Sequence, residues 1–325
     1  MMNPLDQISM VLKRFFLKKN VDEDMMDNML LEYDRSMMGG LHAVLSDDSS
    51  RPRNSFSGGN MGYSIGFSRI FSVIPVMMRL MNSFNESIRK ATEPHDMDYV
   101  NPSGVTEEIS RVAYELGADI VGFTEVTPDL VYAGKEVPYK YAVVLGARMD
   151  NEKIATAPSM DCMLEVFNTY RQLGVLANRL SELIIDMGYD AAPGHPLGGA
   201  VDYPSLARSA GLGEYGRHGL LISPYNGACQ RLAAVFTNLE LPAVHGNPHE
   251  WVRDFCRSCG KCVKMCPAQA IRDEPEPRVG GHYSSVIHER CLQYFGSNYG
   301  CSICIKECPF TTLGYEQIRK SFMKI

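Results

Sequence analysis

Cysteines carry the strongest chemical signal in this chain of 325 residues. Ten are present, and eight of them lie between positions 256 and 308. The first run, CRSCGKCVKMCP, has the spacing C-x2-C-x2-C-x3-C-P, and the second run, CLQYFGSNYGCSICIKECP, closes with the same C-x2-C-x3-C-P. In the second run the first cysteine stands ten residues before the next one, instead of three. Such density indicates either a disulfide scaffold in a secreted protein or a metal site in a reducing compartment.

The spacing of the two runs favours iron–sulfur clusters. A C-x2-C-x2-C-x3-C-P run holds one 4Fe–4S cube through three thiolates, while its fourth cysteine ligates the other cluster. Zinc is the alternative, but zinc sites rarely use a four-cysteine run this dense and then repeat it. We therefore expect one cluster held by Cys256, Cys259, Cys262 and Cys308, and a second held by Cys266, Cys291, Cys301 and Cys304. The two other cysteines, Cys162 and Cys229, are expected to be packed thiols, although Cys229 lies beside a glycine-rich turn and is a candidate to line a pocket.

That glycine-rich turn, GLGEYG at 211–216, matches the G-x-G-x-x-G pattern of dinucleotide-binding proteins. The pattern requires a strand before it, a helix after it and an acidic residue about 20 positions further on. Here the order is reversed, because residues 204–210 predict a short helix that Gly211 ends, and residues 219–222 predict a strand. The next acid, Glu240, lies beyond a further strand-like run. The context disfavours NAD or FAD binding.

The elements that must position these residues fall into three parts of the chain. Residues 1–100 are rich in methionine and predict a mostly helical region around a flexible loop at 46–62. Residues 101–248 have an α/β (α+β) texture, and residues 249–325 contain the cysteine runs. In the middle part we expect strands at 119–126, 141–147 and 232–239, a helix from near Ser103 to Leu116, and a helix at 163–187 with a leucine-rich core-facing stripe.

Charge and hydropathy exclude several classes of protein. With 32 basic and 38 acidic residues the formal net charge is −6, which is no signature of nucleic-acid binding. An export signal would combine a basic start with an uninterrupted apolar core, and no N-terminal stretch shows this pattern. We therefore expect a cytoplasmic protein whose cysteines bind metal. The segment 66–84 is interrupted by Arg69, Pro75 and Arg79, so it predicts a packed helix or an amphipathic helix on a membrane surface.

From about Val105 to Thr312 the chain resembles the reductive dehalogenases and their relative epoxyqueuosine reductase, which are corrinoid enzymes with two 4Fe–4S clusters. The resemblance is carried, in this order, by ADIVGFTEV, YAVVLGARM with IATAPS, YRQLGVLANRLSELIIDMGYDAAP, AGLGEYGRHGLLISPYNGACQRLAAVFTNLELP and the cluster module. It implies an α/β (α+β) corrinoid-binding core joined to a C-terminal ferredoxin-like domain. It also implies cobalamin, bound base-off, as a cofactor beside the two clusters.

The resemblance gives the glycine turn another role. In these families the AGLGE-type turn and the G-x-L-L-I strand help to form the corrinoid pocket, where bare backbone can approach the flat macrocycle. The glycines that would provide this backbone are Gly211, Gly213, Gly216 and Gly219. His195 and Gly198 match part of the D-x-H-x-x-G pattern whose histidine ligates cobalt, but Pro193 stands at the Asp position. Because these families bind the corrinoid without a protein ligand, we interpret His195 as a pocket or loop residue.

The implied reaction passes electrons from a donor, such as a ferredoxin or flavodoxin, through the outer and the inner cluster to cobalt. The substrate would be a small organic molecule, for example an organohalide. Reductive dehalogenases use a tyrosine as proton donor, helped by a basic side chain that favours the phenolate. Tyr170 and Arg231 stand at the matching places, and Tyr225 and Tyr203 are the alternatives to Tyr170.

Two other functions stay open. An epoxyqueuosine-reductase-like enzyme would use Asp202 as its acid, in the segment VDYPSLARSAGLGE. Against it, binding of tRNA favours a basic face, and we expect no room for a helical-repeat tail in the 17 residues after Cys308. An electron-transfer protein without corrinoid would use residues 105–245 only as a docking domain.

Overall fold

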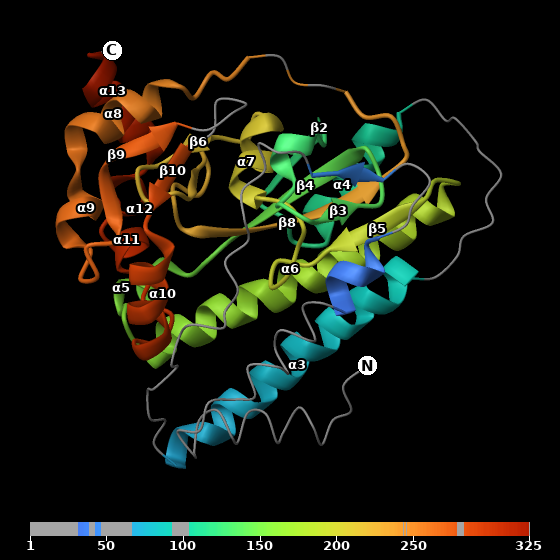
Figure 1. Ribbon diagram of the computed structural model, residues 1–325, viewed down its shortest axis with the longest axis horizontal. Helices are drawn as coiled ribbons and strands as arrows, with labels where there is room; N and C mark the ends of the chain where they lie inside the picture. The colour runs from blue at the N-terminus through green and yellow to red at the C-terminus, as the bar shows by residue number, and fades with distance from the viewer. Residues whose placement is uncertain are drawn as a thin grey trace.

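The computed structural model describes residues 32–38, 43–46, 67–92, 104–242, 244, 246–277 and 283–324. A central sheet flanked by helices carries the cysteine-rich part on one side (Figure 1). The strands are β1 (Val44–Leu45), β2 (Ile120–Glu125), β3 (Glu136–Val137), β4 (Tyr141–Arg148), β5 (Ala191–Gly194), β6 (Glu214–Tyr215), β7 (Leu221–Ile222), β8 (Gln230–Thr237), β9 (Ile271–Pro277) and β10 (Tyr283–Val286). The helices are α3 (Phe67–Thr92), α4 (Val105–Glu115), α5 (Asn151–Ala155), α6 (Met160–Asp186), α7 (Tyr203–Ser209), α8 (Trp251–Cys259), α9 (Lys261–Met265), α10 (His288–Ser297), α11 (Ile303–Lys306), α12 (Pro309–Thr312) and α13 (Tyr315–Met323), with a 3-10 turn at Pro128–Leu130 and a helical turn at 32–36.

The central sheet has the strand order β2-β4-β8-β5, and each of its pairs is antiparallel. β4 and β8 pair along their whole length, from Tyr141 opposite Thr237 to Arg148 opposite Gln230. Odd-numbered residues of β4 join one hydrophobic cluster and even-numbered residues join another, so the sheet is buried on both faces. The strands predicted at 119–126, 141–147 and 232–239 are confirmed, and their antiparallel pairing makes the core α+β.

Long helices cover one face of this sheet. α6 packs on β4, β5 and β8, and α4 lies beside it. The hydroxyl oxygen of Ser159 caps the start of α6 by accepting a hydrogen bond from the N–H of Cys162 at 3.1 Å. The leucine-rich stripe predicted for this helix is buried, with Leu173, Leu176 and Leu180 at most 1% exposed. On the opposite face of the sheet, α7 contributes Leu206 and Ala207 to the hydrophobic cluster that also contains the even-numbered residues of β4.

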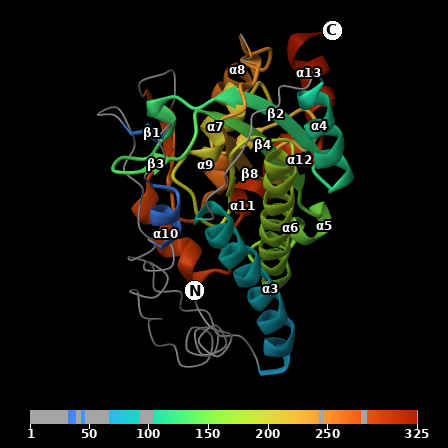
Figure 2. The same cartoon turned by 90° about the vertical axis from the view of Figure 1, so that its right-hand side faces the viewer.

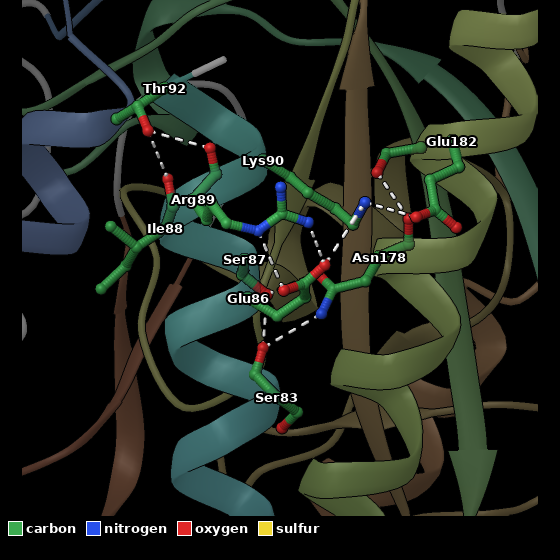
Figure 3. A network of polar contacts seen from close by, with 10 residues as sticks. Ser83, Glu86, Ser87, Ile88, Arg89, Lys90, Thr92, Asn178 and Glu182 are labelled. Atoms are coloured by element: carbon green, nitrogen blue, oxygen red, sulfur yellow. Dashed lines mark hydrogen bonds and ion pairs between the residues drawn. The ribbon is translucent and has the colours of Figure 1, made fainter. Parts of the chain in front are cut away.

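α3 lies alongside α6 in both views of the molecule (Figures 1 and 2). Figure 3 shows the polar contacts between the two helices, where Ser87 Oγ donates to Asn178 Oδ1 at 2.7 Å and Asn178 Nδ2 donates to the carbonyl oxygen of Ser83 at 3.0 Å. Lys90 Nζ lies 2.5 Å from Glu182 Oε1. These buried polar groups therefore find partners across the helix pair. The segment predicted at 66–84 as a packed or surface-lying helix is the first part of α3, and its buried face packs on α6.

The cysteine-rich part gathers α8 to α13 and the β9–β10 hairpin on one side of the core (Figure 1). A shared apolar cluster joins the two parts, with Met149, Ile154 and Ile222 from the core and Trp251 and Phe310 from the cysteine-rich part. The backbones of the two parts also approach each other closely at Gly227 of the core and Phe310 of the cysteine-rich part. A Cβ atom on Gly227 would lie 2.2 Å from the carbonyl oxygen of Phe310. None of the helices in the described ranges has the length and apolarity needed to cross a bilayer.

Candidate functional site

The first expected ligand set comes from three elements of the cysteine-rich part. Cys256 and Cys259 lie on α8, Cys262 lies on α9, and Cys308 precedes α12. Burial, with smaller contributions from the nearby charges of Cys256 and Cys262, raises the pKa of the Cys308 thiol to about 12. Burial likewise raises the pKa of Cys256 to about 12, with Cys262 and Cys259 adding to the effect. The charges of two cysteines of the first run thus act on Cys308, while the crossed ligation stays a prediction.

The second expected set is coupled in the same way. Burial, with smaller contributions from the charges of Cys301 and Cys266, raises the pKa of Cys291 to about 11. The pKa of Cys304 is also raised, mainly by burial and then by Cys301 and Cys291. The long spacer between the first two cysteines of this run forms α10 and a turn in which Tyr299, Cys301 and Ser302 have positive φ. Cys266 thus shares its surroundings with the second run, although it stands in the first.

Tyr170 and Arg231 meet at the junction between the core and the second cysteine set. Tyr170 lies on α6, and Arg231 lies on β8 opposite Ala147 of β4. The guanidinium carbon of Arg231 is 5.4 Å from the centroid of the Tyr170 ring. Among the described residues, Arg231 Nε is buried without a hydrogen-bond partner. Its charge opposes the burial that raises the pKa of Cys304, so the cation also lies near this second set.

The two alternative tyrosines lie elsewhere. Tyr225 is 74% exposed, so water surrounds most of its side chain. The hydroxyl of Tyr203 donates to the carbonyl oxygen of His195 at 3.2 Å. Of the three candidate proton donors, Tyr170 is the one that lies beside Arg231.

Asp202 forms a separate polar cluster at the start of α7. Its carboxylate accepts hydrogen bonds from the hydroxyl of Tyr215 at 2.6 Å and from the hydroxyl of Tyr132 at 3.4 Å. Ser205 Oγ also donates to it, and this hydroxyl lies against that of Tyr215. Asp202 is 9% exposed, so several hydroxyl donors replace the water that a buried carboxylate loses.

His195 is fully buried between the helices and the sheet. Its Nδ1 accepts from the N–H of Leu197 at 3.1 Å, and its Nε2 lies 3.1 Å from the hydroxyl of Ser83 on α3. The ring packs edge-on against Phe84. Burial lowers the pKa of His195 to about 3, so the ring is neutral. Both nitrogens are engaged within the protein, and the side chain ties α3 to the core.

The four predicted glycines lie in and beside the β6–β7 hairpin. Gly211 ends α7 with φ +70°, as the sequence predicts. A Cβ atom on Gly213 would lie 2.2 Å from the carbonyl oxygen of Ile222, and one on Gly216 would lie 2.5 Å from the ring of His218. Gly219 has φ +76° and packs near Val286. The bare backbone is therefore required by packing within the protein itself.

Three further residues lie near the two cysteine sets, and two of them, His218 and Arg217, carry no signal in the sequence. The third, Cys162, is fully buried as a packed thiol; burial raises its pKa, and Ser302 in the second ligand loop opposes that rise. His218 is also buried, its pKa is lowered to about 4 by burial, and within the described structure its Nε2 has no partner. The backbone N–H of Arg217 favours the charged form of Cys256 and so opposes the rise in the pKa of that thiol. Such contacts arise from tertiary packing, so no spacing in the sequence could have predicted them.

Comparison with known proteins matches residues 255–312 to the 4Fe-4S dicluster domain. A tetrachloroethene reductive dehalogenase of Desulfitobacterium hafniense is 34% identical over 242 residues, covering 68% of this chain and 42% of that protein. An epoxyqueuosine reductase of Lactococcus garvieae is 30% identical over 160 residues, covering 43% of this chain and 40% of that protein. The chain thus spans about two fifths of the length of these curated relatives.

A solved structure of a catabolic reductive dehalogenase in complex with 3-bromo-4-hydroxybenzoic acid has the same fold. It superposes with a TM-score of 0.70 at 20% identity, covering 87% of this chain and 45% of that chain. At this identity the likeness concerns the fold, and it extends over the core as well as the cysteine-rich part. The dicluster match confirms the 4Fe–4S prediction over zinc.

Proposed function

We propose, because the chain belongs to the reductive dehalogenase family, related to epoxyqueuosine reductase, that it is a reductase dependent on a corrinoid as well as on its dicluster domain. It passes electrons from an acidic carrier such as a ferredoxin or flavodoxin through two 4Fe–4S clusters. The reaction replaces a halide, or a similar leaving group, on a small organic molecule by hydrogen. Two electrons and one proton are consumed for each halide released.

The observation that carries this proposal is the pair formed by Tyr170 and Arg231 beside the second cysteine set. The pair stands between α6 and β8, and the charge of Arg231 also acts on Cys304. A proton donor is therefore next to the point where electrons leave the clusters. The proton and the electrons must reach the same carbon atom, and at this junction the proton donor lies close to the second cysteine set.

Within this proposal each residue has a stated part. The eight cysteines hold the clusters, and the hydroxyl of Tyr170 gives up its proton to the carbon that loses the leaving group. Arg231 steadies the phenolate that results, because an adjacent cation favours the charged form of an acid. General acid catalysis of this kind contributes on the order of 10²–10⁴ to a rate.

A corrinoid supplies strong reduction at low potential when it is bound. The unpartnered Nε of Arg231 is a buried polar atom at which such a group, or its substrate, would find a hydrogen-bond donor. The side of Gly213 and Gly216 that lacks a side chain is filled by the protein, so their contribution would come from backbone polar groups. His195 has both nitrogens engaged, which suits a corrinoid held without a histidine ligand.

A second candidate function is epoxyqueuosine-reductase-like chemistry on tRNA. The favouring observation is the buried Asp202, whose carboxylate is surrounded by hydroxyl groups of Tyr215, Ser205 and Tyr132. In that function Asp202 would deliver the proton and Tyr170 would be dispensable. The net charge of −6 opposes it, since tRNA binding favours a basic surface.

The two functions are separated by Tyr170→Phe and Asp202→Asn, made in protein reconstituted with clusters and cobalamin. Single-turnover reduction is measured with tetrachloroethene, 3-bromo-4-hydroxybenzoic acid and an epoxyqueuosine-modified tRNA stem loop. We expect Tyr170→Phe to slow halide release by about 10²-fold and Asp202→Asn to leave it within a few-fold of the unmodified chain.

Loss in Asp202→Asn alone, with turnover of the tRNA, would establish the second function instead. If the clusters are reduced but the protein takes up no cobalamin, the result would support an electron-transfer protein without a corrinoid. If neither substitution slows turnover, the acid lies elsewhere. Full incorporation of iron in both variants is the control, because it shows that the electron path is intact.

A further inference from the structure

A small cavity opens beside the first cysteine set. It has a volume of about 130 Å³, and its described lining includes Cys256 itself. Three arginines, Arg217, Arg253 and Arg257, line it, and Glu274 is the one carboxylate among its described lining residues. The remaining walls come from the β6 end of the glycine hairpin and from the β9–β10 hairpin.

Two of the three guanidinium groups carry uncompensated charge. Arg217 is 9% exposed and donates to the backbone carbonyl of Asp273, so its partner is a neutral group. Arg253 lies over the ring of Tyr283, with 4.3 Å between its guanidinium carbon and the ring centroid, and donates to the tyrosine hydroxyl. Within the described structure neither arginine is paired with a carboxylate. Arg257 pairs with Asp254 at 3.0 Å, where both side chains are well exposed and the pair is weak.

The size of the cavity limits what it can hold. Sites for whole cofactors and other small molecules have volumes of roughly 300–1,000 Å³. A volume of about 130 Å³ is well below that range and suits a single carboxylate side chain. The positive lining is also local, because the chain as a whole has a net charge of −6. The observations therefore favour an acidic protein that inserts one side chain here.

We propose that this arginine-lined cavity is the docking point for an acidic one-electron carrier protein, which seats a carboxylate against Arg253 and Arg257 and delivers its electron to the cluster held by Cys256. The inference rests on the proposed function only in that the clusters receive electrons from outside. In each encounter the carrier loses one electron and the cluster gains it, and no bond is made or broken. The second cysteine set, next to Arg231, then lies on the inner side of the path.

Two features of the site suit this role. The backbone N–H of Arg217 opposes the rise in the pKa of Cys256, so a donor stands beside this ligand sulfur, and hydrogen bonds to cluster sulfurs are a means by which proteins tune reduction potential. A carboxylate in the cavity would also touch a ligand of the cluster, since Cys256 lines it. Attraction between opposite charges raises association rates by roughly 10–10³-fold and weakens as salt is added.

The test uses the double variant Arg253→Gln/Arg257→Gln with its clusters in place. Reduced flavodoxin is the acidic carrier, and the reduced methyl viologen cation is a small reductant that needs no basic docking site. Cluster reduction is followed by stopped-flow absorbance at several salt concentrations. Arg111→Gln/Arg179→Gln is the matched control, because it removes the same charge from helices of the core.

We expect the double variant to slow reduction by flavodoxin about tenfold and to flatten its salt dependence. Reduction by methyl viologen should stay within about twofold, and the control variant should match the unmodified chain. An equal loss with both reductants would overturn the proposal, because it would mean that the cluster itself is perturbed. An unchanged flavodoxin rate would also overturn it, even if inorganic phosphate bound to the cavity.

The readout requires neither a corrinoid nor a halogenated substrate. The docking site can therefore be tested even if the proposed function is wrong. Cluster reduction that depends on the arginines, without release of halide, would support the docking site and contradict dehalogenation. Conversely, halide release with flavodoxin that does not depend on Arg253 and Arg257 would support the proposed function and contradict the docking site.

Discussion

At the scale of single residues, burial without a charged partner keeps His195 neutral, and this makes the free energy of unfolding depend on pH. Its pKa is lowered from 6.5 to about 3 in the folded protein. Below about pH 6.5 the unfolded chain binds a proton at this position and the folded chain does not. The stabilising contribution is therefore complete above pH 6.5 and is lost as the pH falls toward 3. We expect the free energy of unfolding to drop by about 1.4 kcal/mol between about pH 7.5 and pH 5.5 from this residue alone.

Urea unfolding of His195→Asn, compared with the unmodified chain at the two pH values, checks this expectation. His218 is buried in the same way and contributes to both proteins, so the difference between the two slopes isolates His195. Equal slopes would mean that the imidazole of His195 is not held neutral. Retention of the hydrogen bond from Leu197 by the asparagine oxygen keeps the comparison fair.

Which residue-scale features the sequence could predict depends on how local their cause is. Spacing within each run predicts the cluster ligands; the charge of Cys256 raises the pKa of Cys308, and the ligand sets themselves stay a prediction. Tyr170 and Arg231 were paired by resemblance, and they lie together. Packing within the protein gives a reason for glycine that the sequence did not predict, because the backbone of Ile222 fills the space beside Gly213. Their contact with a corrinoid stays a prediction.

At the scale of elements, the crossing of the two cysteine runs makes a sharp prediction. Cys262 lies on α9, and Cys266, four residues later, directly follows that helix. Because the charge of Cys266 raises the pKa of Cys291 and of Cys301, and crossed ligation assigns it to their cluster, Cys266→Ser and Cys262→Ser should damage different clusters. EPR spectra of the two reduced variants would show different signals lost. Loss of the same signal in both would mean that each run holds its own cluster.

Elements with strong periodicity could be predicted from the sequence, and pairings between distant elements could not. The stripe of α6 and the apolar runs of β4 and β8 appear where expected. The antiparallel order β2-β4-β8-β5 was not specified, because strand direction depends on which distant segments meet. α10 is not among the predicted elements, because its helical face is short. The loop expected at 46–62 lies almost wholly outside the described residues.

At the scale of the whole molecule, one glycine decides how closely the core meets the dicluster domain. Gly227 has φ +55°, and a Cβ atom there would lie 2.2 Å from the carbonyl oxygen of Phe310. Gly227→Ala should therefore push the two parts of the molecule apart as well as strain the backbone. We expect a lower melting temperature and slower transfer of electrons from the clusters to the site of Tyr170, while iron content is kept.

Gly134→Ala separates these two effects. Gly134 has φ +71°, so an alanine there is strained in a similar way, but its Cβ would meet no atom within 4 Å. This control should lose about 1–3 kcal/mol of stability and no electron transfer. If both variants behave alike, the contact between Gly227 and Phe310 has no part in joining the core to the clusters. The sequence offered no signal for that contact, because it joins residues far apart in the chain.

The hydroxyl of Tyr33 has a consequence for how copies of this protein behave toward one another. β5 is an outer strand of the central sheet, and outer strands present unpaired backbone groups on which a strand of another molecule can add. Tyr33 occupies two such positions, since its hydroxyl donates to the carbonyl of Pro193 at 2.9 Å and accepts from the N–H of His195 at 2.6 Å. Pro193 itself has no N–H to offer. The helical turn at 32–36 thus occupies backbone groups at the end of β5 to which a strand of another copy would otherwise pair.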